Sequence, residues 1–228
     1  MSSASPRRSA LSRGHGGQPA PGRYWTWFLS ARRSAVIRGT TVALRAPEES
    51  DVEVLHKWFQ EESFRLAVGY RYPSSKRMWT QWIASYEQVS YNNATFIFCM
   101  MDSGAPIGLG SLSHQSPEDR SAEFGIAIGE TDNRRRGLGA EAGELLARFG
   151  FEVMGLRRMY SWILTQNSAA VAACESIGAI REGVARNARL VHGAPADLAL
   201  YGLLAEEFAA IFRKTPSTPA GAGQACGE

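Results

Sequence analysis

The stretch DNRRRGLGAE, residues 132–141, places three arginines and a Gly-Leu-Gly step between two periodic segments. Before it, AEFGIAI (122–128) alternates apolar and small or polar residues, which predicts a strand. After it, residues 139–154 repeat apolar side chains at helical spacing. A strand, a glycine turn and a helix start together make a device for binding phosphate, because the first amides of a helix have no intrahelical partner and the helix dipole favours an anion there.

The residue types within the stretch suit a phosphate group. Gly137 and Gly139 have no side chain to hold a phosphate away from the backbone, and Arg134, Arg135 and Arg136 would supply positive charge. It is not a Walker loop, since no Gly-Lys-Ser/Thr follows, and it lacks the Gly-x-Gly-x-x-Gly of dinucleotide sites. Such a stretch in isolation is more often a solvated basic loop.

Further motifs extend the pattern along the chain. Arg134-x-x-Gly137-x-Gly139 resembles the (Gln/Arg)-x-x-Gly-x-(Gly/Ala) signature of the GNAT N-acetyltransferases. The order of the segments resembles the branch that contains the ribosomal-protein alanine acetyltransferases. These segments are EFGIAI, the arginine-glycine stretch, NSAAVAACESIG, REGVAR and the late Gly193 and Asp197. VALRAPEESDVEVLHKWFQ is similar to the first strand and helix of that branch. The resemblance covers about residues 38–210.

The resemblance implies a fold and a donor. The fold is an α/β GNAT fold, a strongly twisted mixed β-sheet splayed at its centre with helices on both faces. Acetyl-CoA, a co-substrate used without a metal, is expected in the splay, with its pyrophosphate on the amides of residues 135–140 and its pantetheine along residues 124–128. The donor contacts expected on this basis are Phe124, Ile126, Ala127, Ile128, Arg134, Arg135, Arg136, Gly137, Leu138, Gly139, Ala140, Asn167 and Ala170.

Acetyl transfer to an amine requires loss of a proton from the amine, stabilisation of an oxyanion and protonation of the CoA thiolate. The resemblance implies direct attack without an acyl-enzyme. Glu123, at the start of the central strand, lies where relatives carry a carboxylate that acts as base through water, and a solvated carboxylate is the alternative. His114 and His56 are further candidate bases, although each is more commonly an exposed surface histidine.

The general acid departs from the family pattern. Cys174 takes the place of a tyrosine that protonates the thiolate in many relatives, and Ala170 takes the place of a serine used by others. A thiol with an ordinary pKa near 8.5 could serve as an acid, whereas a small buried helix residue is the competing interpretation. Asn167 is expected to cap the helix that follows it and to face CoA.

The acceptor pocket is expected between the first two helices, their connecting loop and the hairpin strand. The candidate substrate contacts are Tyr70 and Tyr72 in that loop, His114 after the hairpin strand and Asp197 of the late motif. Asp197 is equally suited to a structural hydrogen bond. The partner would be an amine-bearing small molecule such as an aminated natural product or antibiotic, a peptide or a protein N-terminus. An arginine-rich, lysine-poor composition is typical of GC-rich bacterial genomes, where tailoring and self-resistance acetyltransferases are frequent.

Composition limits the remaining possibilities. No acidic residue precedes Glu48, and residues 48–228 contain 17 basic against 22 acidic residues. An acidic body opposes a general nucleic-acid partner and favours a cationic amine. No apolar run is long enough for a membrane helix. Cys99, Cys174 and Cys226 have no metal-ligand spacing and favour a reduced, cytoplasmic setting.

Three regions are predicted: an N-terminal extension over 1–35, disordered or partly docked through YWTWFLS; one mixed α/β domain over 36–212; and a disordered tail over 213–228. In the domain, Ser50 is expected to cap the first helix with Glu53 completing a capping box. A CoA-binding sensor or structural subunit without transfer activity remains the alternative function, and a homodimer stays open.

Overall fold

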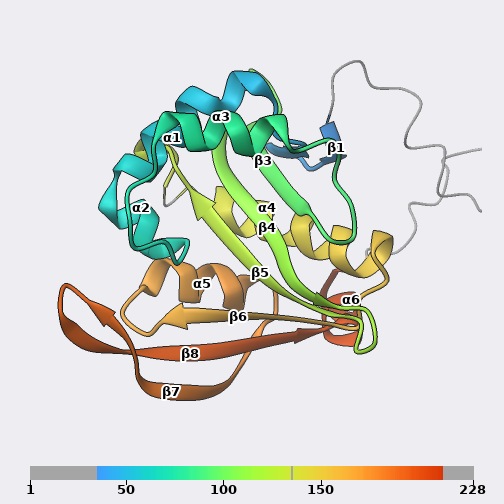
Figure 1. The fold of residues 1–228 in the computed structure, drawn as a ribbon. Helices are drawn as coiled ribbons and strands as arrows, with labels where there is room; N and C mark the ends of the chain where they lie inside the picture. Colours follow the sequence, from blue (N-terminus) through green and yellow to red (C-terminus); the bar gives the residue numbers. More distant parts are fainter. Residues whose placement is uncertain (1–34, 135, 213–228) are drawn as a thin grey trace, which may run out of the picture. The chain divides into compact units, whose positions relative to one another are not determined.

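The computed structural model describes residues 35–134 and 136–212. The predicted N-terminal extension and C-terminal tail, and Arg135 of the arginine-glycine stretch, lie outside the described residues, apart from Ala35. Within them the chain forms the expected mixed α/β architecture (Figure 1). The predicted GNAT-type sheet with helices on both faces is confirmed.

One eight-stranded sheet runs through the described residues in the order β1-β2-β3-β4-β5-β6-β8-β7. Its strands are β1 (Ala35–Arg38), β2 (Val42–Arg45), β3 (Ala94–Met100), β4 (Pro106–Ser116), β5 (Ser121–Ile128), β6 (Arg158–Leu164), β7 (Ile180–Val191) and β8 (Ala194–Leu204). Neighbouring strands pair antiparallel, except that β5 and β6 run parallel.

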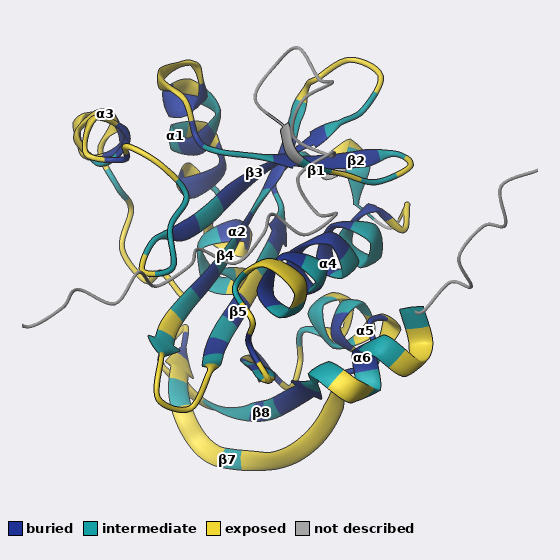
Figure 2. Ribbon diagram, turned by 90° about the vertical axis from the view of Figure 1, so that its right-hand side faces the viewer, coloured by how far each residue is buried: buried dark blue, intermediate teal, exposed yellow. Residues whose placement is uncertain are grey.

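Helices cover both faces of this sheet. They are α1 (Val52–Gln60), α2 (Glu62–Ala67), α3 (Lys76–Ala84), α4 (Leu138–Arg148), α5 (Ser168–Ser176) and α6 (Ala205–Phe212), with a π-helical turn (Phe149–Val153) after α4 and short 3-10 turns at Glu49–Asp51 and Thr131–Asn133. Figure 2 shows α1 and α3 on one side of the sheet and α4, α5 and α6 on the other. The two sides have separate hydrophobic cores.

Alternation along the central strands explains the two cores. In β5, Phe124 packs into the core beneath α4, while Ala127 belongs to the core beneath α1 and α3. Glu123 and Gly125 point to the same side as Ala127, because side chains alternate along a strand. The side of the sheet that carries α1 and α3 therefore also carries the polar residues of β5.

Close packing of α4 depends on one glycine. A Cβ at Gly143 would lie 3.0 Å from the Ile126 side chain and 3.3 Å from that of Ile177. Gly143 thus lets α4 approach β5 and the residue that ends α5. This approach fixes the position of the α4 N-terminus, which follows the arginine-glycine stretch.

Four features differ from the sequence-based expectations. Ser50 does not cap the first helix; it lies inside the 3-10 turn, and the capping box joins Glu48 and Asp51 instead. The strand β1, the helix α2 and the strand β7 were not predicted. Periodicity could not reveal β7, because nearly all of its side chains are exposed at the edge of the sheet, as the yellow ribbon in Figure 2 shows.

A buried ion pair joins β2 to the start of α1. Both Asp51 carboxylate oxygens accept hydrogen bonds from the Arg45 guanidinium at 2.6 Å, and Asp51 also accepts from the Glu48 amide at 2.8 Å. The side chains of Arg45 and Asp51 are 13% and 2% exposed. The hydrogen bond that Arg45 donates to Asp51, aided by the Asp51 charge, raises the pKa of Arg45 against the opposing effect of burial.

We expect Asp51→Ala to lower the free energy of unfolding by about 3–5 kcal/mol, because it leaves the Arg45 charge buried without its partner. Denaturant unfolding measures the change. Glu53→Ala is the matched control: it removes an exposed carboxylate that pairs with Lys76 on the surface, and should cost no more than about 1 kcal/mol. Equal stability of the two variants would contradict the anchoring role of Asp51.

Candidate active site

The site begins where the ladder between β5 and β6 ends. These parallel strands pair through Ser121 with Arg158, Ala122 with Met159 and Glu123 with Tyr160. Beyond Glu123 the ladder stops, although β5 continues to Ile128 and β6 to Leu164. Figure 1 shows the two strands together at one end and apart at the other. This is the splay that the sequence predicted at the centre of the sheet.

The splay exposes one backbone edge of β5. Residues 124–128 pair with β4 on the other edge, so their remaining amides and carbonyls face the gap. Backbone polar groups away from water need partners. An extended amide-bearing chain such as pantetheine matches this edge, and Phe124 and Ala127, whose side chains are buried, would contribute to such contacts through the backbone.

A cavity of about 740 Å³ passes through the splay. On the side of α1 and α3 it is lined by aromatic residues, namely Phe59, Tyr70, Trp79 and Trp82. On the other side it reaches the first turns of α5, with Asn167, Ala170, Ala173 and Cys174 in its wall. The cavity therefore connects a space suited to an acceptor with the helix expected to face CoA.

Glu123 and His114 meet in the wall of this cavity. The His114 Nδ1 atom lies 2.9 Å from a Glu123 carboxylate oxygen, and the side chains are 74% and 28% exposed. A register shift between Ser113 and Ser116 in β4 displaces His114, which takes a left-handed backbone conformation with φ of 50°. Such a conformation is uncommon for a residue other than glycine and is a feature of functional sites.

Two of the predicted candidate bases are thus brought together. Both lie where β4 and β5 pair, and Ser113 is the direct partner of Glu123. The charge of Glu123 also acts on Tyr160 across the last pair of the ladder: burial first, and then Glu123, raises the pKa of Tyr160. His56 is not among the cavity-lining residues, and its ring lies 3.1 Å from the Gln60 amide.

The arginine-glycine stretch forms the N-terminus of α4. Gly137 precedes the helix with φ of 78°, and a Cβ there would meet nothing within 4 Å. A Cβ at Gly139 would contact only Ile128, at 3.8 Å. The helix start is therefore open to a group that approaches its backbone, as a phosphate would. The Leu138 side chain is buried in the core, so this residue can offer only its amide.

The two described arginines of this stretch have different surroundings. Arg134 donates to the carbonyls of Ile128 and Gly129 at 3.2 and 3.1 Å and lies 3.3 Å from Glu61. It therefore fastens the loop to the end of β5. Arg136 is exposed and donates to the Asn133 side chain at 3.1 Å. Arg136 keeps the freedom to reach a phosphate, whereas Arg134 has a positioning role.

A polar contact ties the same region to α1. The Glu130 carboxylate accepts from the Trp58 indole and the Lys57 ammonium, each at 2.9 Å. Burial tends to raise the pKa of Glu130, but these hydrogen bonds outweigh it and lower the pKa overall. A Cβ at Gly129 would collide with the Trp58 ring. These contacts therefore hold α1, on the acceptor side, against the loop that follows β5, on the donor side.

At the donor end of the cavity, α5 begins as the sequence predicted. The Asn167 side chain caps the helix by accepting from the Ala170 amide at 3.2 Å. Cys174 is buried, and this burial raises the pKa of its thiol to about 12, with a smaller contribution from Glu175. The thiol is therefore uncharged at neutral pH.

The candidate acceptor residues divide into two groups. Tyr70 lines the cavity and meets Phe59 edge-on at 5.1 Å, whereas Tyr72 is 80% exposed and is not among the lining residues. Asp197 also lies outside the lining, and its carboxylate accepts from the Asn187 amide at 2.8 Å. These contacts favour the structural interpretation of Asp197.

Among the cavity residues that sequence reasoning missed are Arg189 and Trp162. The sequence pattern predicted a strand at Trp162, but it did not indicate toward which face of the sheet this side chain points. Arg189 belongs to β7, which no periodicity revealed. Trp162 lies on β6, one of the two strands that border the splay, and Arg189 reaches the cavity beside Gly69, a residue distant in sequence.

Comparisons with known proteins agree with this geometry. Residues 41–180 match the family model "Acetyltransferase (GNAT) domain". A solved "probable acetyltransferase" is 26% identical, with a TM-score of 0.64, and the match covers 74% of this chain and 96% of the other. Two further structures have similar folds: spermidine N-acetyltransferase from Vibrio cholerae in complex with CoA and spermine (20% identity, 73% and 97% covered, TM-score 0.66) and ribosomal-protein-S5-alanine acetyltransferase from Vibrio fischeri (16% identity, 75% and 97% covered, TM-score 0.65).

The chain belongs to the acetyltransferase (GNAT) domain family, because the family model spans more than half of it. It is therefore an acyltransferase, and its activity is acetyl-CoA-dependent N-acetyl transfer. Within the described residues, no cluster of three or more histidines, cysteines or carboxylates is arranged to hold a metal ion. None of the described helices is both long and apolar enough to span a membrane.

We expect Gly137→Glu to abolish detectable acetyl-CoA binding in calorimetry, because it adds a side chain and a negative charge where the pyrophosphate must approach the backbone. Gly104→Glu is the matched control. Gly104 also has a left-handed conformation with open space around its Cβ position, but it lies in the β3–β4 turn. Wild-type affinity in a folded Gly137→Glu protein would show that phosphate binds elsewhere.

Proposed function

We propose that this chain transfers the acetyl group of acetyl-CoA directly to a primary amine, with both substrates bound in the cavity at the splay. The observation that carries the proposal is the continuity of one cavity from the Glu123–His114 pair to the first turns of α5. The amine would enter from the aromatic side, beneath α1 and α3. Acetyl-CoA would lie along the open edge of β5, with its pyrophosphate at the start of α4.

The donor contacts proposed at the loop are mainly backbone amides. Gly137, Leu138, Gly139 and Ala140 would supply them, and Arg136 would add charge. An amide near Ile126 or Ala127 would stabilise the oxyanion that forms as the amine adds to the thioester. The N–C bond forms, the C–S bond breaks, and CoA leaves as a thiolate.

Glu123 is the proposed base. It is the less exposed member of the pair, and its carboxylate would take the amine proton through a water molecule. His114 lies on the solvent side of Glu123 and would pass the proton outward. This order follows from exposure, since a proton must travel from the closed part of the cavity to bulk water.

Cys174 is a poor match for the acid that protonates CoA. Proton transfer from a thiol whose pKa is about 12 to a thiolate whose conjugate acid has a pKa near 8.5 is unfavourable. We assign Cys174 a packing role, and a solvent molecule would protonate the CoA thiolate. A free thiolate is a stable leaving group, so the reaction does not require a dedicated acid.

The acceptor proposed here is a small aminated natural product or antibiotic, a peptide or a protein N-terminus. The structural relatives named for spermidine and for a ribosomal protein both act on amines. We also infer a cytoplasmic location in a bacterium, on cysteine usage and on the arginine-rich composition. A self-associated homodimer is compatible with the proposal and is not needed for it.

We expect Glu123→Gln to lower kcat by about 10²–10⁴ at neutral pH, the range that general base catalysis contributes. The deficit should shrink as pH rises, because the amine then loses its proton without help. A pH–rate profile with one good acceptor, followed by thiol detection, measures this. His114→Gln should cost less than Glu123→Gln at every pH. A larger loss in His114→Gln than in Glu123→Gln would make the histidine the base. An unaltered profile in Glu123→Gln would move the base elsewhere, with His114 the next candidate.

We expect Cys174→Ala to keep turnover within a few-fold of wild type and to lower the free energy of unfolding by about 1 kcal/mol, as small core truncations do. Cys99→Ala is the matched control, since Cys99 is also a buried free thiol but lies in β3, outside the cavity lining. A large loss of kcat confined to Cys174→Ala, with CoA affinity unchanged, would make Cys174 the general acid.

A further inference from the structure

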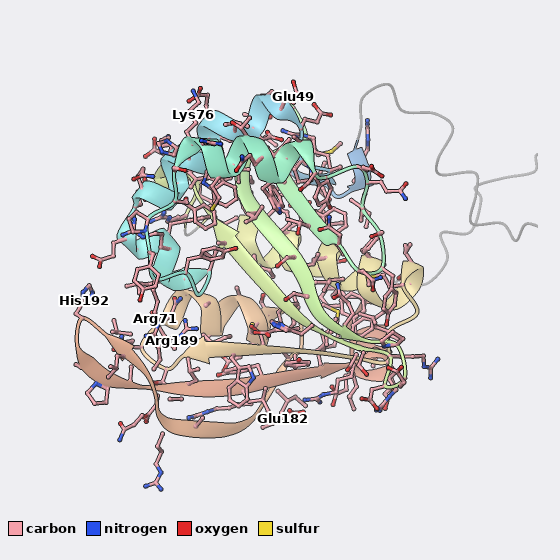
Figure 3. All side chains as sticks on the ribbon, viewed as in Figure 1. Glu49, Arg71, Lys76, Glu182, Arg189 and His192 are labelled. Carbon is pink, nitrogen blue, oxygen red and sulfur yellow. The ribbon has the colours of Figure 1, made fainter. Side chains whose placement is uncertain are left out.

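The β7–β8 hairpin forms one wall of the acceptor side of the cavity. The Nη1 and Nη2 atoms of Arg189 each lie 3.6 Å from the position of a Cβ at Gly69, two residues after the end of α2. At the tip of the hairpin, His192 lies 3.6 Å from Glu62 of α2. Figure 3 labels Arg189 and His192 on this hairpin, with Arg71 near the end of α2. Two segments far apart in sequence thus meet at the cavity.

Arg189 brings a positive charge to this wall. It lines the cavity, and within the described residues no hydrogen bond or ion pair engages its guanidinium. The acidic side chains on neighbouring elements are each engaged elsewhere: Glu62 with His192, Glu182 with Arg158, and Asp197 with the Asn187 amide. Asp197 also points to the opposite face, because Arg189 is the direct partner of Ala196.

The cavity therefore has two separated charged positions. Among the described lining residues, Glu123 is the one carboxylate and Arg189 the one arginine or lysine. Aromatic residues line the same side of the cavity. The ring centroids of Trp79 and Trp82 are 5.7 Å apart, and those of Phe59 and Trp79 are 4.4 Å apart. An arginine fork suits a planar anion such as a carboxylate.

This distribution is unfavourable for a polyamine. A chain with several ammonium groups needs several carboxylates, and the cavity offers Glu123 alone, already paired with His114. The acidic balance of the whole body does not override this, because charges beyond about 8–10 Å are screened at physiological salt. The local arrangement favours an acceptor with charge at both ends.

We propose that Arg189 binds an anionic group of the acceptor, so that the substrate class is a primary amine joined through an apolar or aromatic segment to a carboxylate. This proposal rests on the proposed function, because it assigns a role to the acceptor side of the same cavity. The amine lies toward Glu123 and the carboxylate lies at Arg189. Arg71, two residues after Gly69, adds a further positive charge near Arg189, as Figure 3 shows.

The test compares matched acceptors that differ in one charge. The small-molecule pair is para-(aminomethyl)benzoate and its benzamide, with homologues one and two methylenes longer. The peptide pair is Ala-Phe-Glu and Ala-Phe-Gln, both with amidated C-termini. The first pair probes free small acids and the second probes acidic peptides. The measured quantity is the ratio of kcat/KM for acid over amide, by thiol detection.

We expect wild type to prefer the acid by about 10- to 100-fold in at least one pair, the effect of a charge-assisted hydrogen bond. Arg189→Gln should bring this ratio close to one, Arg189→Glu should invert it, and Arg189→Lys should restore part of it. Arg186→Gln is the matched control, because Arg186 is exposed on the same strand and outside the cavity lining. It should keep the wild-type ratio.

Calorimetric binding of the same pairs to the CoA complex gives the ratio without turnover. If no amine releases CoA but the binding ratio is large and depends on Arg189, the catalytic proposal fails and the assignment of Arg189 stands. If amines are acetylated but acid and amide are used equally, or Arg189→Gln keeps the ratio, the assignment of Arg189 is overturned and the catalytic proposal stands.

Discussion

The end of the β5–β6 ladder at Glu123 and Tyr160 is the constraint on which the rest of the site depends. Parallel strands that remained paired to Ile128 would use the backbone edge of β5 and close the sheet. Because β6 pairs with β8 over its whole length, from Arg158 to Leu164, it follows that strand away from β5. The cost of the gap is an unpaired backbone edge, which a bound extended substrate would satisfy.

The position of the splay also fixes what surrounds it. On one face, Gly143 allows α4 to pack directly on Ile126, so the helix N-terminus lies beside the end of β5. On the other face, Trp58 packs against Gly129 and donates to Glu130. The consecutive residues Gly129 and Glu130 therefore hold α1, on the acceptor side, against the loop on the donor side. A change at this point should affect both substrates together.

Charge within the site is arranged locally rather than by the balance of the whole chain. The described body is acidic in sequence, yet its cavity contains one carboxylate in contact with a histidine and one arginine without an acidic partner. Nearby acidic residues such as Glu182 and Asp197 are tied to other groups and do not neutralise that arginine. Net charge is therefore a poor guide to which amine enters, whereas Glu123 and Arg189 are charges within the cavity itself.

Elements with strong local signals could be predicted before any tertiary contact was known. The alternation of β5, the helical repeat of α4, the Gly137 turn and the Asn167 cap depend on near neighbours in the chain, and all were predictable. Local signals also misled: Ser50 had the composition of a cap, but the capping box joins Glu48 and Asp51, and the Asp51 carboxylate also accepts from the buried Arg45. Only the tertiary structure brought His114 onto Glu123, because a register shift in β4 turns the histidine toward it. Only the tertiary structure placed Arg189, on an exposed edge strand with no periodicity, beside Gly69 in the wall of the cavity. Local backbone preferences act over a few residues, whereas Glu123 and Arg189, which line one cavity, are 66 positions apart in the sequence.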